Sequence, residues 1–409
     1  MSEWKRYKLG ELLSIKHGWA FKSENYVKDG KTALVTLRNI SEDSRFVFNV
    51  NKTTYYGGEY PEEYNLNEGD LIIPLTEQVV GLLGNSAFVP NFSDIKFVLN
   101  QRVGKVQEKY EKIDKIFLKY LLSTTTVRTQ MEYRASGTKQ RNISPKDIYD
   151  IEVYIPELVI QKYIGRILYN IDNKIQINNQ INQELEAMAK TLYDYWFVQF
   201  DFPDQNGKPY KSSGGKMVYH PELKREIPEG WGVEKLGDIT ICHDSKRVPL
   251  SSNDRELVKG KIPYYGATGI MDYVNDYIFD GDYVLMAEDG SVMTEKGTPI
   301  LQRISGKNWV NNHAHVLEPV KNHSCKLLMM LLKDVSVMKI KTGSIQMKIN
   351  QENMNKIVVP AIPLELLFEI NQKLEVIDKQ QLNLIEENKQ LTQLRDWLLP
   401  MLMNGQVII

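Results

Sequence analysis

Cysteine is almost absent from this chain of 409 residues. Its two cysteines, Cys242 and Cys325, are too few and too far apart for a disulfide framework or a cysteine-rich zinc site. Such scarcity is typical of proteins that fold in a reducing compartment. The chain also lacks an apolar stretch of the roughly 18 residues that a membrane span needs, and the first residues, Met1 to Arg6, lack the apolar run of a secretory signal. We therefore expect a cytoplasmic protein.

An excess of charge of one sign is absent as well. The chain has 51 Lys and Arg against 52 Asp and Glu, so its formal net charge is -1 at pH 7. This balance excludes a strongly basic protein that coats DNA. It does not exclude a DNA-binding protein with local cationic loops, because binding depends on where the cations lie. With 42% hydrophobic and 25% charged residues the composition is that of a folded protein, and the length suggests two or three domains at ~150 residues each.

The residue patterns of common DNA-modifying and ATP-driven enzymes are missing. We find neither the Asp/Asn-Pro-Pro-aromatic motif and glycine-rich loop of an adenine methyltransferase, nor the Gly-x-x-x-x-Gly-Lys-Ser/Thr loop of an ATPase. Asp204 and Lys208 have the spacing of part of a nuclease site, but no second carboxylate supports them. His313 and His315 alternate as ligands on a strand can, yet no further close ligand follows. We therefore expect no adenine methyltransferase site and no ATP-driven translocation, and we predict neither a cofactor nor a metal.

An internal repeat is the most informative feature that is present. Its landmarks recur in the same order in both halves of the chain, at an offset that shrinks as the loops differ in length. The matched landmarks are Trp4 with Trp231, Leu9-Gly10 with Leu236-Gly237, Gly69-Asp70 with Gly281-Asp282, Val98 and Asn100 with Val310 and Asn312, Ser136-Gly137 with Thr342-Gly343, Gln140 with Gln346, Ile143 with Ile349, and Ile171-Asp172 with Ile377-Asp378. An ordered series of this length indicates two related halves.

Each half has two parts. In the first part, short apolar strand-like runs alternate with Gly, Asn and Asp turns, and the second part is one long helix. The sequence thus predicts an α+β protein in five segments. These are a first mixed domain (1–155), a first long helix (156–200), a connector (201–227), a second mixed domain (228–360) and a second long helix (361–409).

Both long helices carry a heptad of apolar residues. Positions 370, 377, 384, 391 and 398 are Ile, Ile, Leu, Leu and Leu, and the matching positions of the first helix are Ile, Ile, Asn, Leu and Leu. Such a stripe must be covered, and a partner helix covers it most simply. Asn178, Gln381 and Asn388 fall on or near the seam, where buried polar residues fix register. The alternative is two amphipathic helices that each pack on their own domain.

On these residues the chain resembles the specificity subunit of a type I restriction-modification enzyme. The order of mixed domain, helix, mixed domain, helix is the most specific part of the resemblance. The segments that carry it are Trp4 to Glu11, Ile143-Ser144-Pro145-Lys146-Asp147-Ile148, Phe200-Asp201-Phe202-Pro203, Pro228-Glu229-Gly230-Trp231, Trp231 to Asp238, Pro263 to Gly269, and Leu398-Leu399-Pro400.

The resemblance implies two target-recognition domains, each of which reads one half of a split double-stranded DNA sequence. The two helices would form an antiparallel coiled coil that sets the separation of the half-sites. They would also carry two modification (methyltransferase) subunits, with restriction subunits outside them, and the specificity subunit itself would do no chemistry. The repeat supports this independently, because a duplicated chain can mimic the two-fold dimers that bind paired half-sites.

Polar loops that combine cations, amides and small hydroxyls are the candidate DNA contacts, because such side chains bind base edges and phosphates. The first loop supplies Ser136, Thr138, Lys139, Gln140, Arg141 and Asn142. Its counterpart supplies Lys341, Thr342, Ser344, Gln346 and Lys348. A second pair of candidates is Asn100, Gln101 and Arg102, matched by Asn312 and His313 with Ala314 in place of Arg102. Weaker candidates are Lys16-His17, Lys22, Arg38-Asn39, Thr76-Glu77-Gln78, Lys246-Arg247, Tyr264-Tyr265 and Glu288-Asp289-Gly290-Ser291.

Two other functions stay open on the sequence alone. The first is a stand-alone DNA-modifying or DNA-cleaving enzyme with an unrecognised site, which would turn over DNA with Mg²⁺ or S-adenosylmethionine. The second is a protein-interaction scaffold, which would not retain DNA even at low salt. For every candidate loop, the alternative to DNA contact is an ordinary exposed loop.

Overall fold

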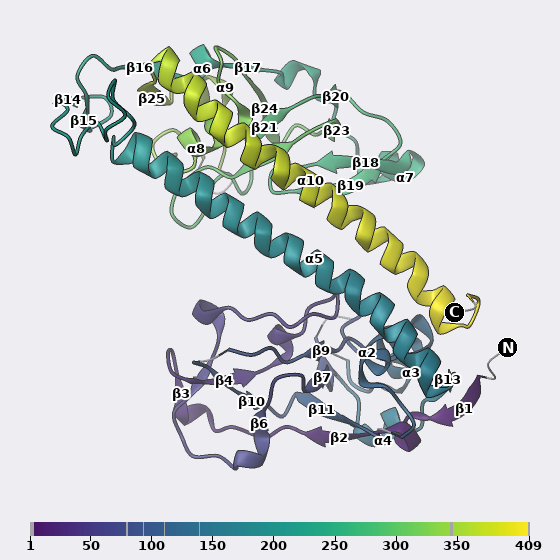
Figure 1. Ribbon diagram of the computed structural model, residues 1–409. Coiled ribbons are helices and arrows are strands. Elements are labelled where there is room, and N and C mark those ends of the chain that lie inside the picture. Colours follow the sequence, from purple (N-terminus) through teal and green to yellow (C-terminus); the bar gives the residue numbers. More distant parts are fainter. Residues whose placement is uncertain are drawn as a thin grey trace. The chain divides into compact units, whose positions relative to one another are not determined.

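The computed structural model describes residues 4–78, 81–92, 94–109, 111–138, 140–343 and 347–407. The chain divides into two compact units, of which the first is Met1–Asn178 with Glu387–Ile409 and the second is Asn179–Glu386. Each unit holds one mixed domain and one segment of each long helix, α5 (Leu158–Tyr193) and α10 (Leu364–Met403) (Figure 1). The predicted fold class, two mixed domains and two long helices in an internal repeat, is confirmed.

The first mixed domain is built on two sheets, ordered β3-β5-β4-β10-β6 and β2-β11-β7-β9. Its strands are β1 (Lys5–Lys8), β2 (Leu13–His17), β3 (Tyr26–Val27), β4 (Thr32–Val35), β5 (Tyr55–Tyr56), β6 (Asn65–Leu66), β7 (Leu71–Pro74), β8 (Thr76–Glu77), β9 (Ala87–Phe88), β10 (Lys96–Leu99), β11 (Val103–Glu108), β12 (Arg141–Asn142) and β13 (Glu152–Ile155). Its helices are α1 (Leu9–Leu12), α2 (Lys115–Ser123), α3 (Thr125–Arg134) and α4 (Pro145–Tyr149). Every residue of β7 is buried, as a short apolar run bounded by turns predicts.

The second mixed domain also has two main sheets, ordered β17-β24-β21-β22 and β19-β18-β23-β20. Its strands are β16 (Gly232–Lys235), β17 (Thr240–Cys242), β18 (Lys259–Tyr265), β19 (Ile270–Val274), β20 (Phe279–Asp280), β21 (Tyr283–Ala287), β22 (Leu301–Ile304), β23 (Lys307–Val310), β24 (Ala314–Pro319) and β25 (Val358–Ala361). Its helices are α6 (Leu236–Ile239), α7 (Ser252–Leu257), α8 (Cys325–Leu332) and α9 (Gln351–Asn355). Helix α8 begins after Ser324, whose side chain accepts from the N–H of Leu327, and most of its residues are buried.

The two domains repeat one backbone framework. In the first, β2, β11, β7 and β9 form consecutive antiparallel pairs, and β17, β24, β21 and β22 do the same in the second. In the first mixed domain β10 pairs with β4 in parallel, and in the second mixed domain β23 pairs with β18 in the same way. In each domain the first strand pairs with the last, β1 with β13 and β16 with β25. The two ends of each mixed domain are therefore joined by a strand pair before its long helix begins.

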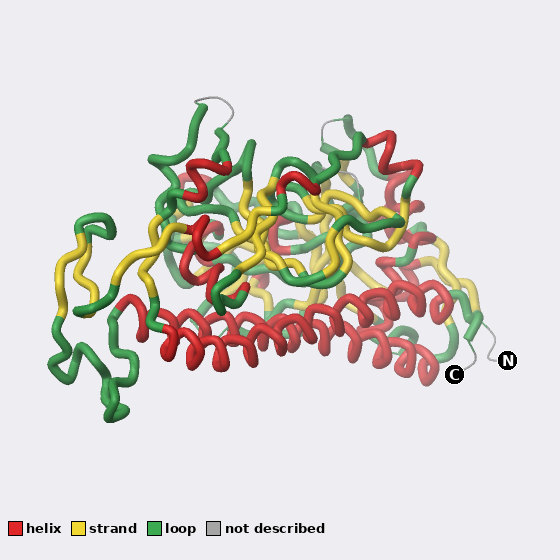
Figure 2. Tube along the Cα trace, turned by 90° about the horizontal axis from the view of Figure 1, so that it is seen from above, coloured by secondary structure: helices red, strands yellow, loops and turns green. Residues whose placement is uncertain are grey.

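Within each unit the segments of α5 and α10 lie side by side and run antiparallel (Figures 1 and 2). In the first unit, Asp172 of α5 accepts a 3.0 Å hydrogen bond from Arg395 of α10, and Asn178 donates to Asn388 at 2.9 Å. In the second unit, Gln381 donates to the carbonyl of Asn182 at 3.1 Å, and the ammonium of Lys373 lies over the ring of Trp196. The numbering on α10 falls as that on α5 rises, which confirms the antiparallel pairing.

The polar seam residues predicted from the heptad lie where expected. Asn178 is fully buried and donates to both Glu387 and Asn388. Gln381 accepts from the ammonium of Lys326 at 2.7 Å, besides its bond to α5. Because each amide finds its partner in only one register, these residues specify how the helices align.

The connector has structure of its own. It forms a hairpin of β14 (Met217–His220) and β15 (Arg225–Pro228), and Phe202 is buried in a stack with Tyr210 and Trp231. Helix α10 continues through Pro400 to Met403, and its last residues Leu402 and Met403 are buried in the core of the first unit. No helix within the described ranges is both long and apolar enough to cross a membrane.

Candidate nucleic-acid interface

The first loop (residues 136–142) is held as a tight hairpin beside β8. Ser136 and Asn142 exchange backbone hydrogen bonds of 2.9 and 2.8 Å, and β12 pairs with β8. At Gly137, φ is +112°, and a Cβ atom there would lie 2.1 Å from the carbonyl oxygen of Gln140, so the turn requires glycine. Ser136, Thr138 and Asn142 are exposed. Lys139, also predicted as a contact, lies outside the described residues.

The first turn (residues 100–102) lies beside this loop, as Leu75 shows. The N–H of Leu75 donates to the carbonyl of Arg102 at 2.9 Å, and the carbonyl of Leu75 accepts from the N–H of Ile143 at 3.0 Å. Gln101 and Arg102 are exposed, whereas Asn100 is buried and its side chain caps the N–H of Arg102. The structure therefore brings together two segments that the sequence identified separately.

A cleft of ≈ 490 Å³ lies between the first loop and the first turn. Polar side chains from both segments line it, with additions from β2 and β8. These side chains are Gln101, Arg102, Ser136, Gln140, Asn142, His17 and Thr76, and Ser144 and Asp147 after the loop also line the cleft. Gln140 donates to the side chain of Asn142 at 3.1 Å, so the two amides present a joined set of donors and acceptors. Such a set matches what base edges offer in the major groove.

The guanidinium of Arg141 is bound to other residues of the same domain. Its guanidinium lies 3.1 Å from Oε1 of Glu77 and also donates to the carbonyl of Glu132. Glu77 is 1% exposed, and its other oxygen accepts from the N–H groups of Gly81, Leu82 and Leu83. Arg141 is thus an anchor of the loop. Glu77 was only a weak contact candidate on the sequence, and no local pattern shows that its carboxylate is buried.

The described parts of the second loop (341–343 and 347–348, of the loop defined as residues 341–348) are joined by the same kind of backbone pairing as the first loop. Thr342 and Lys348 exchange backbone hydrogen bonds of 2.7 and 2.9 Å, and Gly343 has a φ of +80°. Lys348 is exposed, but its ammonium lies 3.0 Å from Glu288, and Lys341 is half-buried. Ser344 and Gln346, also predicted contacts, lie outside the described residues.

At the second turn (residues 311–313) the structure shows that the two halves of the repeat align one residue earlier than the sequence match suggested. Asn100 follows β10 and donates through its N–H to Val35, and Asn311 follows β23 and donates likewise to Tyr265. The side chain of Asn311 accepts from the N–H of His313, as Asn100 does from Arg102. Asn311 is therefore the counterpart of Asn100, and His313, rather than Ala314, takes the place of Arg102. The sequence match failed because two asparagines, Asn311 and Asn312, stand side by side.

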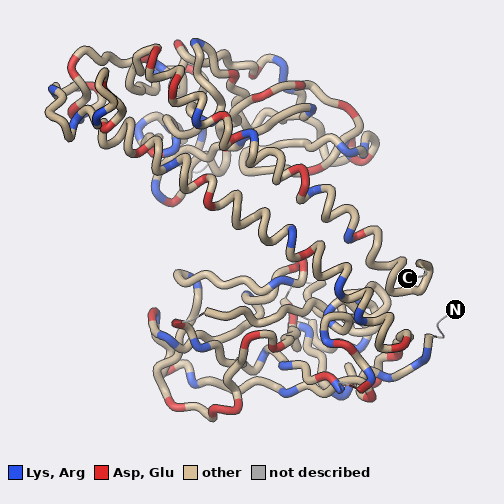
Figure 3. Tube along the Cα trace, viewed as in Figure 1, with Lys and Arg blue, Asp and Glu red and all other residues tan. Residues whose placement is uncertain are grey.

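The second loop and second turn also meet. The N–H of Glu288 donates to the carbonyl of His313 at 2.9 Å, and the carbonyl of Glu288 accepts from Ile349 at 2.8 Å. Asn312 is exposed, and His313 is hydrogen-bonded to Asp289 through Nδ1. Both domains thus present one loop and one turn on one backbone plan, with different side chains. Lys and Arg are interspersed with Asp and Glu along both units (Figure 3), so any binding of DNA depends on these local groups.

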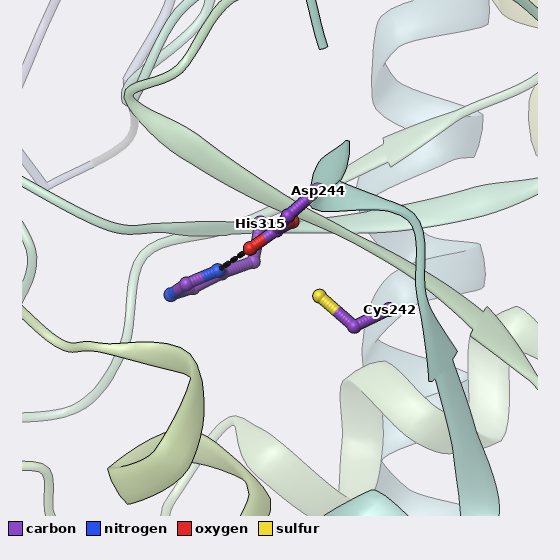
Figure 4. Close-up of side chains that lie close together, drawn as sticks. All are labelled: Cys242, Asp244 and His315. Atoms are coloured by element: carbon purple, nitrogen blue, oxygen red, sulfur yellow. Dashed lines mark hydrogen bonds and ion pairs between the residues drawn. The ribbon is translucent and has the colours of Figure 1, made fainter. Parts of the chain in front are cut away.

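Cys242, Asp244 and His315 converge beneath the second loop (Figure 4). Their side-chain donor atoms all lie within 4.8 Å of one another, which raises the question of a metal site. Asp244 already accepts from Nδ1 of His315, and the guanidinium of Arg247 lies 3.2 Å from the same oxygen. Burial raises the pKa of the Cys242 thiol to about 12, which disfavours the thiolate that a metal needs. These contacts favour a network of paired charges over a cation site.

Comparison with known proteins gives a consistent result. The family model described as "Type I restriction modification DNA specificity domain" matches residues 1–187 and 228–393. The type I restriction enzyme HindI specificity subunit of Haemophilus influenzae is 22% identical over 479 aligned positions that cover 100% of both chains. The MjaIX specificity subunit of Methanocaldococcus jannaschii is 24% identical over 71% of this chain and 68% of that protein.

Two further matches are more limited, the first in the length that it covers and the second in sequence identity. S.HindORF215P of Haemophilus influenzae, described as a type I specificity subunit, is 33% identical, but the match spans only 37% of this chain and 39% of that protein. The crystal structure of the type I restriction-modification S subunit from M. genitalium aligns with a TM-score of 0.58 over 98% of this chain and 96% of that one, at 17% identity. At this identity the likeness shows the fold alone.

Proposed function

The chain belongs to the family of type I restriction-modification DNA specificity subunits, and from that premise we propose that it reads a two-part DNA sequence. In this proposal residues 1–155 read one half-site and residues 228–360 read the other. The observation that carries it is the repeated loop-and-turn framework, in which the side chains differ between the domains. Two domains that share a backbone but present different side chains suit an asymmetric, bipartite target.

We assign the contacts in the first domain to the side chains that the cleft leaves free. Gln101, Arg102, Gln140 and Asn142 present amides and a guanidinium, which recognise adenine and guanine edges. Ser136 and Thr138 are exposed hydroxyls suited to phosphate. In the second domain Asn312, His313, Thr342 and Lys348 take these positions. Arg141 is left out, because its ion pair with Glu77 leaves its side chain only 22% exposed, whereas the side chains of His313 and Lys348 stay about half-exposed in their own ion pairs.

We also propose that the long helices carry two modification subunits, with restriction subunits joining outside them. Large apolar side chains are exposed on both helices, and in this position they add no stability to the isolated chain. They include Val159, Tyr163 and Met188 on α5 and Phe368, Val376 and Trp397 on α10. Because the specificity subunits with which this chain groups are non-catalytic, the chemistry belongs to those partners. Chromosomal DNA as the target also implies a cytoplasmic location.

Methylation mapping tests the proposal. Cells that express this chain with its modification subunit should methylate one bipartite sequence, and exchange of residues 228–360 for those of another family member should change one half-site. A stand-alone enzyme would instead modify or cut DNA without partners, and a protein scaffold would leave DNA unbound.

A further inference from the structure

The two mixed domains differ at one buried position beneath their loops. Gly104 of β11 and His315 of β24 occupy the same place, because Val103 pairs with the last residue of β7 and Ala314 with the last residue of β21. In the first domain a Cβ atom at Gly104 would lie 2.7 Å from Ile15 and 3.2 Å from Leu75, so the site is closed and apolar. In the second domain the counterparts of Ile15 and Leu75 are Cys242 and Glu288. A polar network replaces an apolar contact.

His315 is hydrogen-bonded through both of its ring nitrogens. Nε2 donates to the carbonyl oxygen of Ile349 at 2.8 Å, because a carbonyl can only accept, and the ring is fully buried. Nδ1 is hydrogen-bonded to the carboxylate of Asp244. Burial alone would raise the pKa of Asp244, but its hydrogen bonds with His315 and Cys242 and the charge of Arg247 outweigh burial and lower that pKa.

The charges around His315 form a chain that ends on the second loop. Arg247 lies 3.2 Å from Asp244 and 2.6 Å from Glu288, and Lys348 lies 3.0 Å from the other oxygen of Glu288. Burial raises the pKa of Glu288, but its bonds to Arg247 and Lys348 outweigh this and lower it. Asp244 and Glu288 thus share the guanidinium of Arg247, and Glu288 also pairs with Lys348, which is half-exposed. Each ion has a partner of opposite charge, as burial requires.

This network adds anchors that the shared backbone does not supply. Both domains have the backbone bond from the residue after the loop, Ile143 to Leu75 and Ile349 to Glu288. Only the second domain adds the bond from His315 to the carbonyl of Ile349. The first domain instead uses Glu77 and Arg141, and the counterpart of Glu77 is Gly290, whose N–H donates to Met347. Each loop is therefore fixed by its own buried charge.

We propose that His315 is a positioning residue that sets specificity at one half-site, by holding the end of the second loop from beneath. The inference rests on the proposed function, because it concerns how that loop reads DNA. His315 itself is buried and touches no DNA. It fixes Ile349 and, through Glu288, Lys348, so that the exposed face of the loop keeps one position. The first half-site does not depend on it.

The test uses the full chain in complex with its modification subunit and maps methylation across a library of sites. In His315→Gln, the half-site read by the second domain should lose discrimination roughly tenfold, since one good base contact contributes about that much, while the first half-site keeps its wild-type preference. His323→Gln is the matched control, because His323 is also buried in this domain and bonds only to Val320. It should change neither half-site.

Each outcome decides the inference. Wild-type discrimination in His315→Gln, or equal relaxation of both half-sites, overturns it. If that variant yields no folded complex, Glu288→Gln takes its place and should relax the same half-site. If neither variant folds, the network is a folding element and the proposal fails. A wild-type complex without bipartite methylation contradicts the proposed function itself, which separates the two failures.

Discussion

Glu77 and Arg141 form an ion pair of 3.1 Å that joins the end of β8 to the first loop. The carboxylate of Glu77 is 1% exposed and also accepts three backbone N–H groups. The pair occupies the guanidinium of Arg141, one of the two cationic side chains of the loop. It leaves the neutral amides of Gln140 and Asn142 in the cleft, and neutral amides discriminate bases by geometry more than by charge.

Glu77→Gln should loosen the first loop and cost about 1–3 kcal/mol of stability, because buried N–H groups and a guanidinium lose a charged acceptor. Discrimination at the first half-site should fall while the second half-site stays unchanged. Denaturant unfolding and methylation mapping give the two readouts. Glu59→Gln, at an exposed position of the same domain, is the control and should leave both measurements at wild-type values.

Asn142→Ala should weaken binding to the cognate site by ~1–3 kcal/mol and relax the preference at one base pair, as expected for loss of a base contact. Arg141→Ala should act differently, because its guanidinium is bound to Glu77. It should lower stability as well as affinity. Titration of each purified complex with cognate and mismatched duplexes at one fixed salt concentration measures the effect. Equal loss on both duplexes for Asn142→Ala would assign it to phosphate contact instead.

Asp172→Asn should destabilise the first unit by ~3–5 kcal/mol at neutral pH, because it leaves a buried cation unpaired. The carboxylate lies 3.0 Å from the ammonium of Lys119 and 3.0 Å from Arg395, and accepts from Tyr120 at 2.7 Å. Asp396→Asn is the matched control, because that side chain is exposed and contacts the same arginine. Its change should stay within about 1 kcal/mol.

The same carboxylate predicts a pH dependence. Burial raises the pKa of Asp172, but Lys119, Tyr120 and Arg395 outweigh burial and lower it below its ordinary value of 3.8. The unfolded chain therefore binds this proton first as the pH falls, so the contribution is complete well above pH 3.8 and is lost as the pH falls toward the folded pKa. As the pH falls below 3.8, the wild type should lose stability more steeply than Asp172→Asn. Parallel slopes in urea titrations would contradict this assignment.

Phe368→Ser and Val376→Ser should weaken assembly with modification subunits, because both side chains are more than 60% exposed on α10. Their loss should leave the stability of the isolated chain almost unchanged, since they contribute little to its core. Sedimentation of the mixed subunits measures assembly. Glu375→Ser, between them on the helix surface, is the control. If Phe368→Ser and Val376→Ser both assemble like the wild type, the surface that binds the modification subunits lies elsewhere.

Much of the architecture follows from the sequence, because it rests on periodicity. The heptads gave both long helices and placed Asn178, Gln381 and Asn388 on the seam. The short apolar runs gave strands such as β7 and β21, and the glycine at 137 marked the loop turn. These features are local, so the sequence alone carries them.

The features that were missed depend on contacts distant in sequence. The pairing of β8 with β12 brings Arg141 to Glu77, which no local pattern indicates. The backbone bond of Asn311 to Tyr265, and not its identity, reveals the true register of the repeat. The sequence predicted a connector at 201–227 but not that Phe202 and Ile227 within it are buried. Composition gave no sign of where those side chains would find partners.

The most direct measurement of the central claim is the methylation pattern of cells that carry this chain with residues 228–360 replaced by those of a relative. Long-read sequencing of genomic DNA reads both half-sites and the spacer at once. We predict that one half-site changes while the other half-site and the spacer length stay as in the wild type. A change in both half-sites, or in neither, would contradict a chain in which each mixed domain reads its own half of the target.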